Sequence, residues 1–256
     1  MLDYLLFGAL PYVALAVFLI GSIYRYTKKG FQVSSLSSQF LEGRKLFFGS
    51  QFFHWGIVML FFGHLIGFLI PNAVVAWNGS PVRLLVLEFT AFGFAISSLI
   101  GLLLLIKRRA TTKRIQMVSN YMDYVVYLVL FVQIASGILM AYYGRWGSNW
   151  FASVMTPYLR SVFAFNPNVD LIAQLSTSNT MALLMVKTHI ASAFLIIGII
   201  PFTRFVHFLV APFDYIWRKY QLVIWNWNHK EIIFLEKVEI LRTINKTAYC
   251  SLTLII

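Results

Sequence analysis

The sequence QFFHWGIVMLFFGHLIGFLI, residues Gln51–Ile70, is the most informative part of the chain. It holds 20 consecutive residues whose only ionisable side chains are two histidines. A helix of about 20 apolar residues crosses the hydrocarbon core of a bilayer, which is about 30 Å thick. The run is continuously apolar rather than alternating, and backbone polar groups in lipid need partners within their own segment. The stretch therefore predicts a transmembrane helix.

Four further stretches have the same character: Leu5–Tyr24, Leu84–Ile106, Met122–Tyr143 and Met181–Val210. The whole chain is 59% hydrophobic and only 12% charged, whereas a soluble domain carries about 25% charged residues. This composition excludes a soluble enzyme and a disordered chain. The single cysteine, Cys250, excludes an internal disulfide, a four-cysteine iron–sulfur site and a CxxCH haem attachment. We expect an all-α integral membrane protein, a bundle of five helices.

The basic residues predict the orientation of this bundle. Of the 21 lysines and arginines, 16 lie in three segments, namely Arg25–Ser50, Lys107–Tyr121 and the region from Ala211 onward. Only three lie in the alternate segments, Pro71–Arg83 and Gly144–Thr180. Basic loops stay on the cytoplasmic side of a membrane, which predicts the N-terminus outside and the C-terminus inside. The net charge of +12 is then explained without nucleic acid as a partner.

Four of the five histidines fall inside two predicted spans. His54 and His64 lie in the second span, and His189 and His207 lie in the fifth, while His229 falls in a polar tail where we expect it to be solvated. An ionisable group within a membrane is costly and indicates a functional site. The alternative for each is a structural histidine that hydrogen-bonds to a neighbouring helix.

The directions of the two spans predict which histidines lie level. The second and fifth spans run in opposite directions, so His54 lies level with His207 and His64 with His189. An ideal helix separates His54 from His64 by about 15 Å and His189 from His207 by about 27 Å. His189 and His207 are then five turns apart on one face, and the mismatch of about 12 Å must be absorbed by helix tilt.

Paired imidazoles in a dry site predict haem rather than zinc. Zinc takes four ligands, or three and an open water position, whereas haem iron takes two axial ligands on opposite sides of a planar ring. Two histidines of one helix cannot straddle a ring, so each pair draws one ligand from each helix. Four histidines predict two b-type haems between the second and fifth helices, with electron transfer as their function.

Other residues in these spans fit haem but have alternatives. Gly56, Gly63 and Gly67 form one stripe on the second helix, which permits close approach either of a macrocycle or of another helix. Arg204 and Lys187, near His207 and His189, would neutralise haem propionates or would simply extend their charges to the membrane surface.

Four stretches carry a resemblance to a known family: PYVALAVFLIGSIYRY (Pro11–Tyr26), SSQFLEGRKLFFGSQFFHWGIVMLFFGHLIGFLIP (Ser37–Pro71), LLLLIKRR (Leu102–Arg109) and THIASAFLIIGIIPFTRFVHFLVAPFDYIWRKYQLV (Thr188–Val223). The chain resembles the gamma, or cytochrome b, subunit of membrane-bound respiratory nitrate reductase. The resemblance covers about residues 11–226. It implies one membrane domain, residues 1–226, and a cytoplasmic tail of unknown role, residues 227–256.

The resemblance also implies the roles of the histidines. His54 and His207 would ligate the iron of an inner, proximal haem, and His64 and His189 that of an outer, distal haem. Quinol from the quinone pool would be oxidised beside the outer haem. Electrons would pass to an iron–sulfur beta subunit and then to a molybdenum-containing alpha subunit on the cytoplasmic face of a prokaryotic plasma (inner) membrane. Nitrate chemistry belongs to that alpha subunit, so no catalytic residue is expected here.

The quinol site is indicated less directly. Arg83 corresponds to a basic residue of the family near the quinone, where lysine is more familiar, and Arg83 cannot exchange a proton as lysine can. Gly63, beside His64, and Lys187 are the other candidates. Two alternatives stay open: the same haem subunit in another quinone-linked complex, such as a sulfur-compound reductase or nitrite oxidoreductase, and a non-redox membrane protein with structural histidines.

Overall fold

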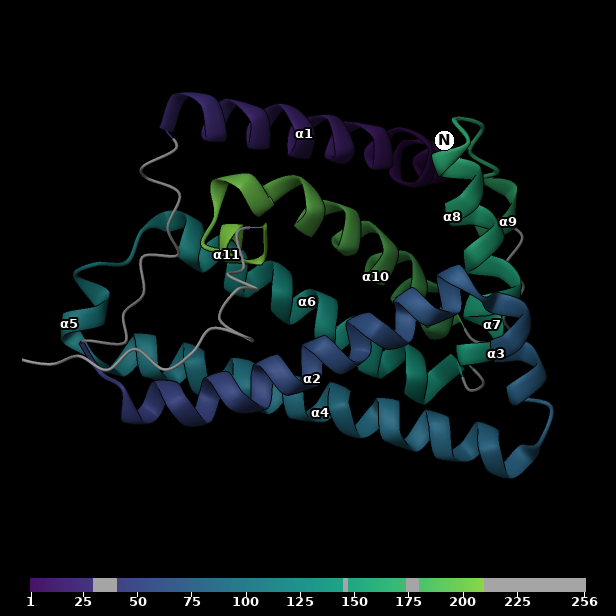
Figure 1. The fold of residues 1–256 in the computed structure, drawn as a ribbon, viewed down its shortest axis with the longest axis horizontal. Coiled ribbons are helices and arrows are strands. Elements are labelled where there is room, and N and C mark those ends of the chain that lie inside the picture. The colour runs from purple at the N-terminus through teal and green to yellow at the C-terminus, as the bar shows by residue number, and fades with distance from the viewer. Residues whose placement is uncertain (30–40, 145–146, 174–179, 210–256) are drawn as a thin grey trace, which may run out of the picture. The chain divides into compact units, whose positions relative to one another are not determined.

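The computed structural model describes residues 1–29, 41–144, 147–173 and 180–209. These residues belong to a unit that spans Met1–Ala211. The described residues form helices and turns without strands, which confirms the prediction of an all-α protein (Figure 1). The predicted tail, residues 227–256, and His229 lie outside the described residues.

Five helices in the described part of the chain are long and apolar enough to cross a membrane. The first joins a π-helical turn, η1 (Tyr4–Ala9), to α1 (Leu10–Lys29). The others are α2 (Arg44–Leu69), α4 (Pro81–Thr111), α6 (Tyr121–Gly144) and α10 (Thr180–Ile199). Each overlaps one predicted span, so the prediction of five membrane helices is confirmed.

Short helices gather at the two ends of this bundle (Figure 1). We call one end the loop-helix end, because it contains α3 (Pro71–Trp77), α7 (Gly147–Trp150), η3 (Phe151–Met155), α8 (Thr156–Phe163) and α9 (Asp170–Ala173). We call the other the basic end, because it contains Arg108 and Arg109 at the end of α4. The basic end also contains α5 (Lys113–Gln116), η4 (Ile200–Phe202) and α11 (Val206–Leu209).

Neighbouring helices pack in the order α2, α4, α6, α10 and α1. Small residues bring α2 and α4 close together. A Cβ at Gly101 would lie 2.3 Å from the backbone nitrogen of Phe53, and one at Gly56 would lie 2.6 Å from the carbonyl oxygen of Phe94. Small residues at such crossings let backbones approach in membranes, where packing rather than the hydrophobic effect drives association.

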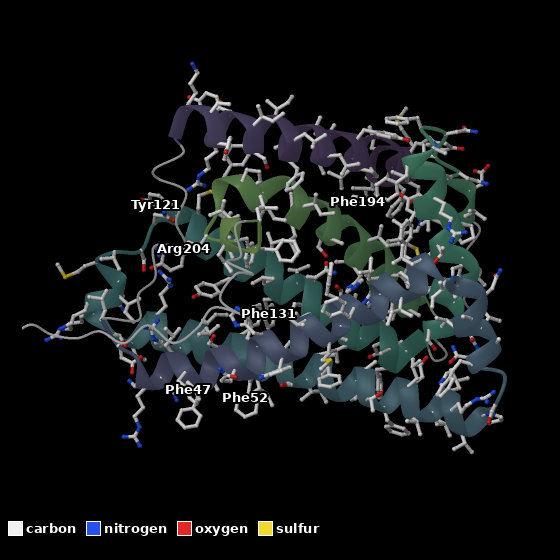
Figure 2. The ribbon with its side chains drawn as sticks, viewed as in Figure 1. Phe47, Phe52, Tyr121, Phe131, Phe194 and Arg204 are labelled. Carbon is white, nitrogen blue, oxygen red and sulfur yellow. The ribbon has the colours of Figure 1, made fainter. Side chains whose placement is uncertain are left out.

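Large apolar side chains cover the outside of the bundle. Phe47 and Phe52 of α2 are 59% and 48% exposed, and Figure 2 shows both pointing away from the neighbouring helices. Phe194 of α10, in contrast, is buried in a cluster with Phe7 and Ile190. Exposed aromatic side chains along a long apolar helix are compatible with contact to lipid, which agrees with a membrane-spanning bundle.

The predicted fifth helix, Met181–Val210, is wrong in its last third. α10 ends at Ile199, a 3₁₀ turn follows at η4, and Thr203 is extended before α11 begins. Pro201 explains the break, because proline lacks a backbone N–H and disfavours helical geometry in the residue before it. His189 and His207 therefore do not share one face of a single helix about 27 Å apart, and the predicted 12 Å mismatch between the pairs no longer arises.

Candidate functional site

The histidines lie in the two pairs that the sequence predicts. The rings of His64 and His189 have centres 6.3 Å apart with their planes at 29°. The rings of His54 and His207 have centres 6.2 Å apart with their planes at 59°. The pairing runs in opposite senses along the two segments, so α2 is antiparallel to the chain that carries His189 and His207.

Every one of these rings is held through its Nδ1 atom by a backbone carbonyl. The Nδ1 to oxygen distances are 2.9 Å from His54 to Ser50 and 2.7 Å from His64 to Leu60. They are 2.9 Å from His189 to Gln133 and 2.7 Å from His207 to Arg204. A carbonyl oxygen only accepts, so Nδ1 is the donor in each ring, which leaves Nε2 as the nitrogen that can face a metal. Metal-binding histidines are oriented in the same way, with the other ring nitrogen donating to a carbonyl.

The ring separations fit a metal atom held between two imidazoles. A metal–imidazole bond is about 2.0–2.1 Å long and the ring centre lies about 1.2 Å behind the bonded nitrogen, so one shared metal places ring centres about 6.4 Å apart. Within the described residues, no three histidine, cysteine or carboxylate side chains come together to hold a metal ion. Two ligands suit haem iron better than zinc, and the residues present fit two haems.

Gln133 of α6 lies against the His64–His189 pair. Its amide nitrogen is 3.1 Å from His189 Nε2, and its side-chain oxygen accepts a hydrogen bond from Ser192. Ser136, one turn further along α6, lies 3.3 Å from His189 Nδ1. A metal bound at His189 Nε2 would require the Gln133 amide to rotate away. The sequence reasoning did not single out these residues, although a glutamine inside a membrane span is a signal.

The glycine stripe on α2 divides into two kinds of position. Cβ atoms at Gly56 and Gly67 would approach Phe94 and Phe151 within 3.0 Å, so both glycines serve packing. A Cβ at Gly63 would meet no heavy atom within 4 Å. Gly137 of α6 is a further close approach, because a Cβ there would lie 2.9 Å from Cε1 of His189.

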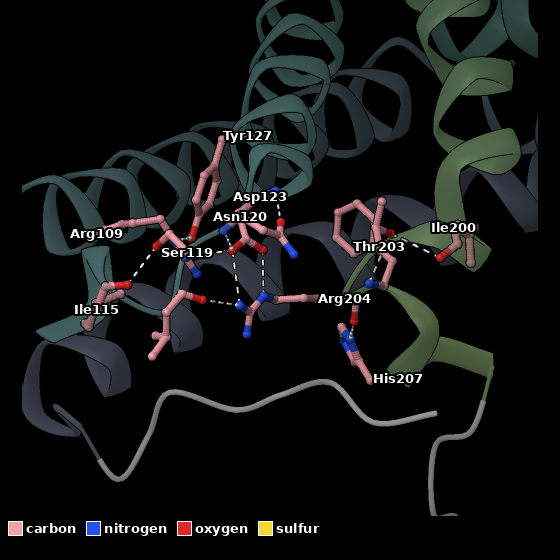
Figure 3. Close-up of polar contacts among 12 residues, drawn as sticks. Arg109, Ile115, Ser119, Asn120, Asp123, Tyr127, Ile200, Thr203, Arg204 and His207 are labelled. Atoms are coloured by element: carbon pink, nitrogen blue, oxygen red, sulfur yellow. Dashed lines mark hydrogen bonds and ion pairs between the residues drawn. The ribbon is translucent and has the colours of Figure 1, made fainter. Parts of the chain in front are cut away.

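Arg204 belongs to a buried cluster at the basic end (Figure 3). Its guanidinium donates to both oxygens of Asp123, at 2.6 and 3.1 Å, and to the carbonyl of Val118 at 3.1 Å. Arg109 of α4 contacts the same carboxylate at 2.9 Å. Asp123 is 5% exposed, and the sequence reasoning missed it. Arg204, which lies three residues before His207, is thus paired with the carboxylate of Asp123.

The other two basic candidates also have partners. Lys187 pairs with Asp3 at 2.8 Å. Arg83 donates to the carbonyl of Trp77 at 2.8 Å, and its guanidinium carbon lies 5.2 Å from the centre of the Trp77 ring. Both residues lie toward the loop-helix end, where the His64–His189 pair also lies. The described contacts join neither of them to that pair.

An open pocket of about 580 Å³ also lies at the loop-helix end, between α3 and the η3–α8 segment. Its lining includes Val75, Ala152, Thr156 and Arg160. Phe151, next to Ala152 in sequence, places its ring 5.2 Å from that of His64. The volume is within the usual range for small-molecule sites, about 300–1,000 Å³.

Two groups outside the membrane spans have shifted pKa values. Burial, with a smaller contribution from Tyr12, raises the pKa of the Tyr158 hydroxyl, which donates to the carbonyl of Phe7 at 2.7 Å. Burial opposes the ionisation of Glu42, yet hydrogen bonds from the Lys45 backbone and from Arg108 hold its pKa below the ordinary value. Tyr158 joins α8 to η1 at the loop-helix end, and Glu42 pairs with Arg108 of α4 at the basic end.

Comparison with known proteins places this arrangement in a family. Residues 3–226 match the family model described as nitrate reductase gamma subunit. The chain belongs to this family.

Curated relatives of this gamma-subunit family member agree. The nitrate reductase gamma chain of Bacillus subtilis is 31% identical over 219 residues, which cover 84% of this chain and 95% of the relative. The respiratory nitrate reductase 1 gamma chain of Escherichia coli is 30% identical over 230 residues, covering 87% and 97%. The nitrate reductase-like protein NarX of Mycobacterium tuberculosis is 32% identical over 228 residues, which are 33% of that longer protein. The chain is thus a membrane subunit of a nitrate reductase complex, an oxidoreductase.

Proposed function

We propose that this subunit anchors the nitrate reductase complex in the prokaryotic plasma membrane and links quinol oxidation on one face to nitrate reduction on the other. The observation that carries the proposal is the pair of facing imidazoles at each of two depths, all four with Nδ1 held by a backbone carbonyl. A structural histidine needs no facing imidazole, and two such pairs on the same segments are difficult to explain without two cofactors.

The residues of each pair hold and orient one haem b. His54 and His207 would hold the haem at the basic end, and His64 and His189 the haem at the loop-helix end. When bound, the two haems would supply one-electron transfer between the faces of the membrane. The carbonyl partners of Nδ1 would orient each ring so that Nε2 is the nitrogen available to iron.

The proposed orientation places the basic end in the cytoplasm. Arg108 and Arg109 of α4 lie there, together with Lys113 and Arg114 of α5, as the positive-inside rule requires. The basic end would then face the iron–sulfur beta subunit, which passes electrons to a molybdenum-containing alpha subunit.

Quinol would be oxidised at the loop-helix end, with its protons released outside. Support comes from the open pocket at this end and from Phe151, whose ring lies 5.2 Å from that of His64 and which precedes the pocket-lining residue Ala152 in sequence. Gly63, next to His64, leaves open space on α2. Arg83 and Lys187 lie toward this end and stay quinol-contact candidates, with Arg83 limited to a fixed charge.

Rapid mixing of a quinol analogue with membranes that hold the whole complex tests the proposal. In His207→Ala, quinol should still reduce the remaining haem, but nitrate should no longer reoxidise it. In His64→Ala, quinol should not reduce the remaining haem, whereas nitrate should still oxidise that haem after chemical reduction. If quinol reduced the haem of His64→Ala at the wild-type rate, the assignment of the quinol end would be wrong, and a chain without any b-type absorbance would refute the haem function itself.

A further inference from the structure

The segment that carries His207 lacks the support of a long helix. α10 ends at Ile199, and α11 is only four residues long. A single turn does not fix its own position, because isolated short helices are unstable. The position of His207 opposite His54 must therefore come from contacts between residues 200–209 and the rest of the bundle.

Apolar contacts provide part of this support. Val206 is buried, and Phe205 packs against the cluster of Phe53, Leu102, Leu130 and Ile134 between α2, α4 and α6. Such contacts resist displacement of the segment as a whole. They are not directional, so they do not fix the rotation of the backbone about His207.

Arg204 provides the directional contact. Its guanidinium grips both carboxylate oxygens of Asp123, with Nε to Oδ1 at 2.6 Å and Nη2 to Oδ2 at 3.1 Å. Its backbone carbonyl accepts the Nδ1–H of His207 at 2.7 Å. The residue that Asp123 holds is thus the residue that orients the ring (Figure 3). Asp123 lies at the start of α6, 81 positions from Arg204.

We propose that Asp123 is a positioning residue for the His54–His207 haem, acting through Arg204. The inference rests on the proposed function, since it assigns a role toward a haem at this pair. The carboxylate is buried and the guanidinium side chain is partly buried: Asp123 is 5% exposed and the Arg204 side chain 24%. A two-pronged contact between guanidinium and carboxylate fixes direction as well as distance. His189 needs no such device, because it lies within the 20-residue helix α10 and donates to Gln133.

Asp123 has a second partner that provides a matched control. Arg109 contacts the same carboxylate at 2.9 Å, and it also donates to Ser119 at 2.5 Å. It joins α4 to the start of α6, and its polar contacts in the described part of the chain go to α6 and the turn before it rather than to residues 200–209. A purely structural role for Asp123 predicts equal effects of losing Arg109 and Arg204. A positioning role predicts that only the loss of Arg204 or Asp123 weakens retention of the His54–His207 haem.

The variants are Asp123→Asn, Arg204→Gln and Arg109→Gln in the purified full chain. Each is assayed by transfer of haem to an apoprotein acceptor, by redox titration and by low-temperature EPR, which reports the angle between axial imidazole planes. Loss of an outer-shell partner costs about 10–100-fold in metal affinity. We expect at least tenfold weaker retention and an altered EPR signal of the His54–His207 haem in Asp123→Asn and Arg204→Gln. The His64–His189 haem in the same samples, and both haems of Arg109→Gln, should be unchanged.

A second readout does not need haem. The rings of Phe61 and Phe208 lie 5.9 Å apart, so cysteines placed there report the position of α11. In the full chain with Cys250→Ser, the Phe61→Cys and Phe208→Cys pair should cross-link rapidly with a short bifunctional thiol reagent. Adding Arg204→Gln should slow cross-linking at least threefold, and adding Arg109→Gln should not. Arg204→Gln leaves Asp123 paired with Arg109, so it protects the fold should Asp123→Asn fail to assemble.

The outcomes separate this inference from the proposed function. A wild-type chain without haem refutes the proposed function, and cross-linking still tests the position of α11. A wild-type chain with two haems, together with Arg204→Gln whose haem retention and cross-linking are normal, refutes the inference alone. If Asp123→Asn strengthened retention of the haem, the positive charge of Arg204 rather than its position would stabilise the haem. The inference would then be wrong.

Discussion

The two histidine pairs use the same chemistry on different supports. His64 and His189 both lie within long helices, α2 and α10, and their rings are close to parallel at 29°. His54 also lies in α2, but His207 follows a helix break, and its ring meets that of His54 at 59°. The first pair is fixed by helix packing, the second by an anchored segment. A site within continuous helices is sensitive to substitutions that crowd the packing around it. A site on a short segment is sensitive to loss of the contacts that hold the segment in place.

The largest effect expected from this difference is that of Gly137→Ala. The added Cβ would lie 2.9 Å from Cε1 and 3.2 Å from Nδ1 of His189, and a partly buried ring whose Nδ1 is hydrogen-bonded to the Gln133 carbonyl cannot easily move. Overpacking of this kind costs about 1–3 kcal/mol, or about 5- to 150-fold in retention of the His64–His189 haem. Haem transfer to an acceptor protein measures it.

The control for Gly137→Ala is Gly93→Ala, because a Cβ at Gly93 of α4 meets nothing within 4 Å. We expect Gly93→Ala to match the wild type and the His54–His207 haem to be unchanged in both variants. Equal losses from both haems in Gly137→Ala would contradict the separate support of the two pairs.

A smaller effect is expected from Pro201→Ala. Alanine removes the main obstacle to continuing α10, so the segment that carries His207 should gain an alternative helical conformation. Substitutions that add or remove proline change stability by about 0.4–1 kcal/mol, which corresponds to about two- to fivefold weaker retention of the His54–His207 haem. Redox titration should show the other haem unaltered. A loss confined to the His64–His189 haem would contradict the claim that the break at Pro201 helps to place His207.

The smallest effect is a difference in pH response between the two ends. The lowered pKa of Glu42 means that its contribution to stability is complete above its ordinary value of 4.5 and is lost as the pH falls below that value. The raised pKa of Tyr158 means that its contribution is complete below the ordinary tyrosine value and declines as the pH rises above it. Hydrogen exchange should therefore increase first around residues 42–46 in acid and around residue 7 in alkali. Glu42→Gln should remove the acid response, and the opposite order would refute these assignments.

Much of the architecture could be predicted from the sequence, because apolar length and basic loops have direct physical meanings in a bilayer. The five spans followed from apolar length, and the pairing of His54 with His207 and His64 with His189 followed from the alternating helix direction. The break after α10 had a visible signal in Pro201, but the apolar run continues past it and hid the change of conformation. The partner of Arg204 could not be predicted, since Asp123 lies 81 positions away and only packing brings the two together.

Haem content of the purified chain and of the four single histidine-to-alanine variants tests the central claim most directly. We predict two b-type haems per wild-type chain, with distinct redox components. His54→Ala and His207→Ala should each lose one and the same component, and His64→Ala and His189→Ala should each lose the other. A wild-type chain with fewer than two haems, or variants of one pair that lose different components, would contradict the account.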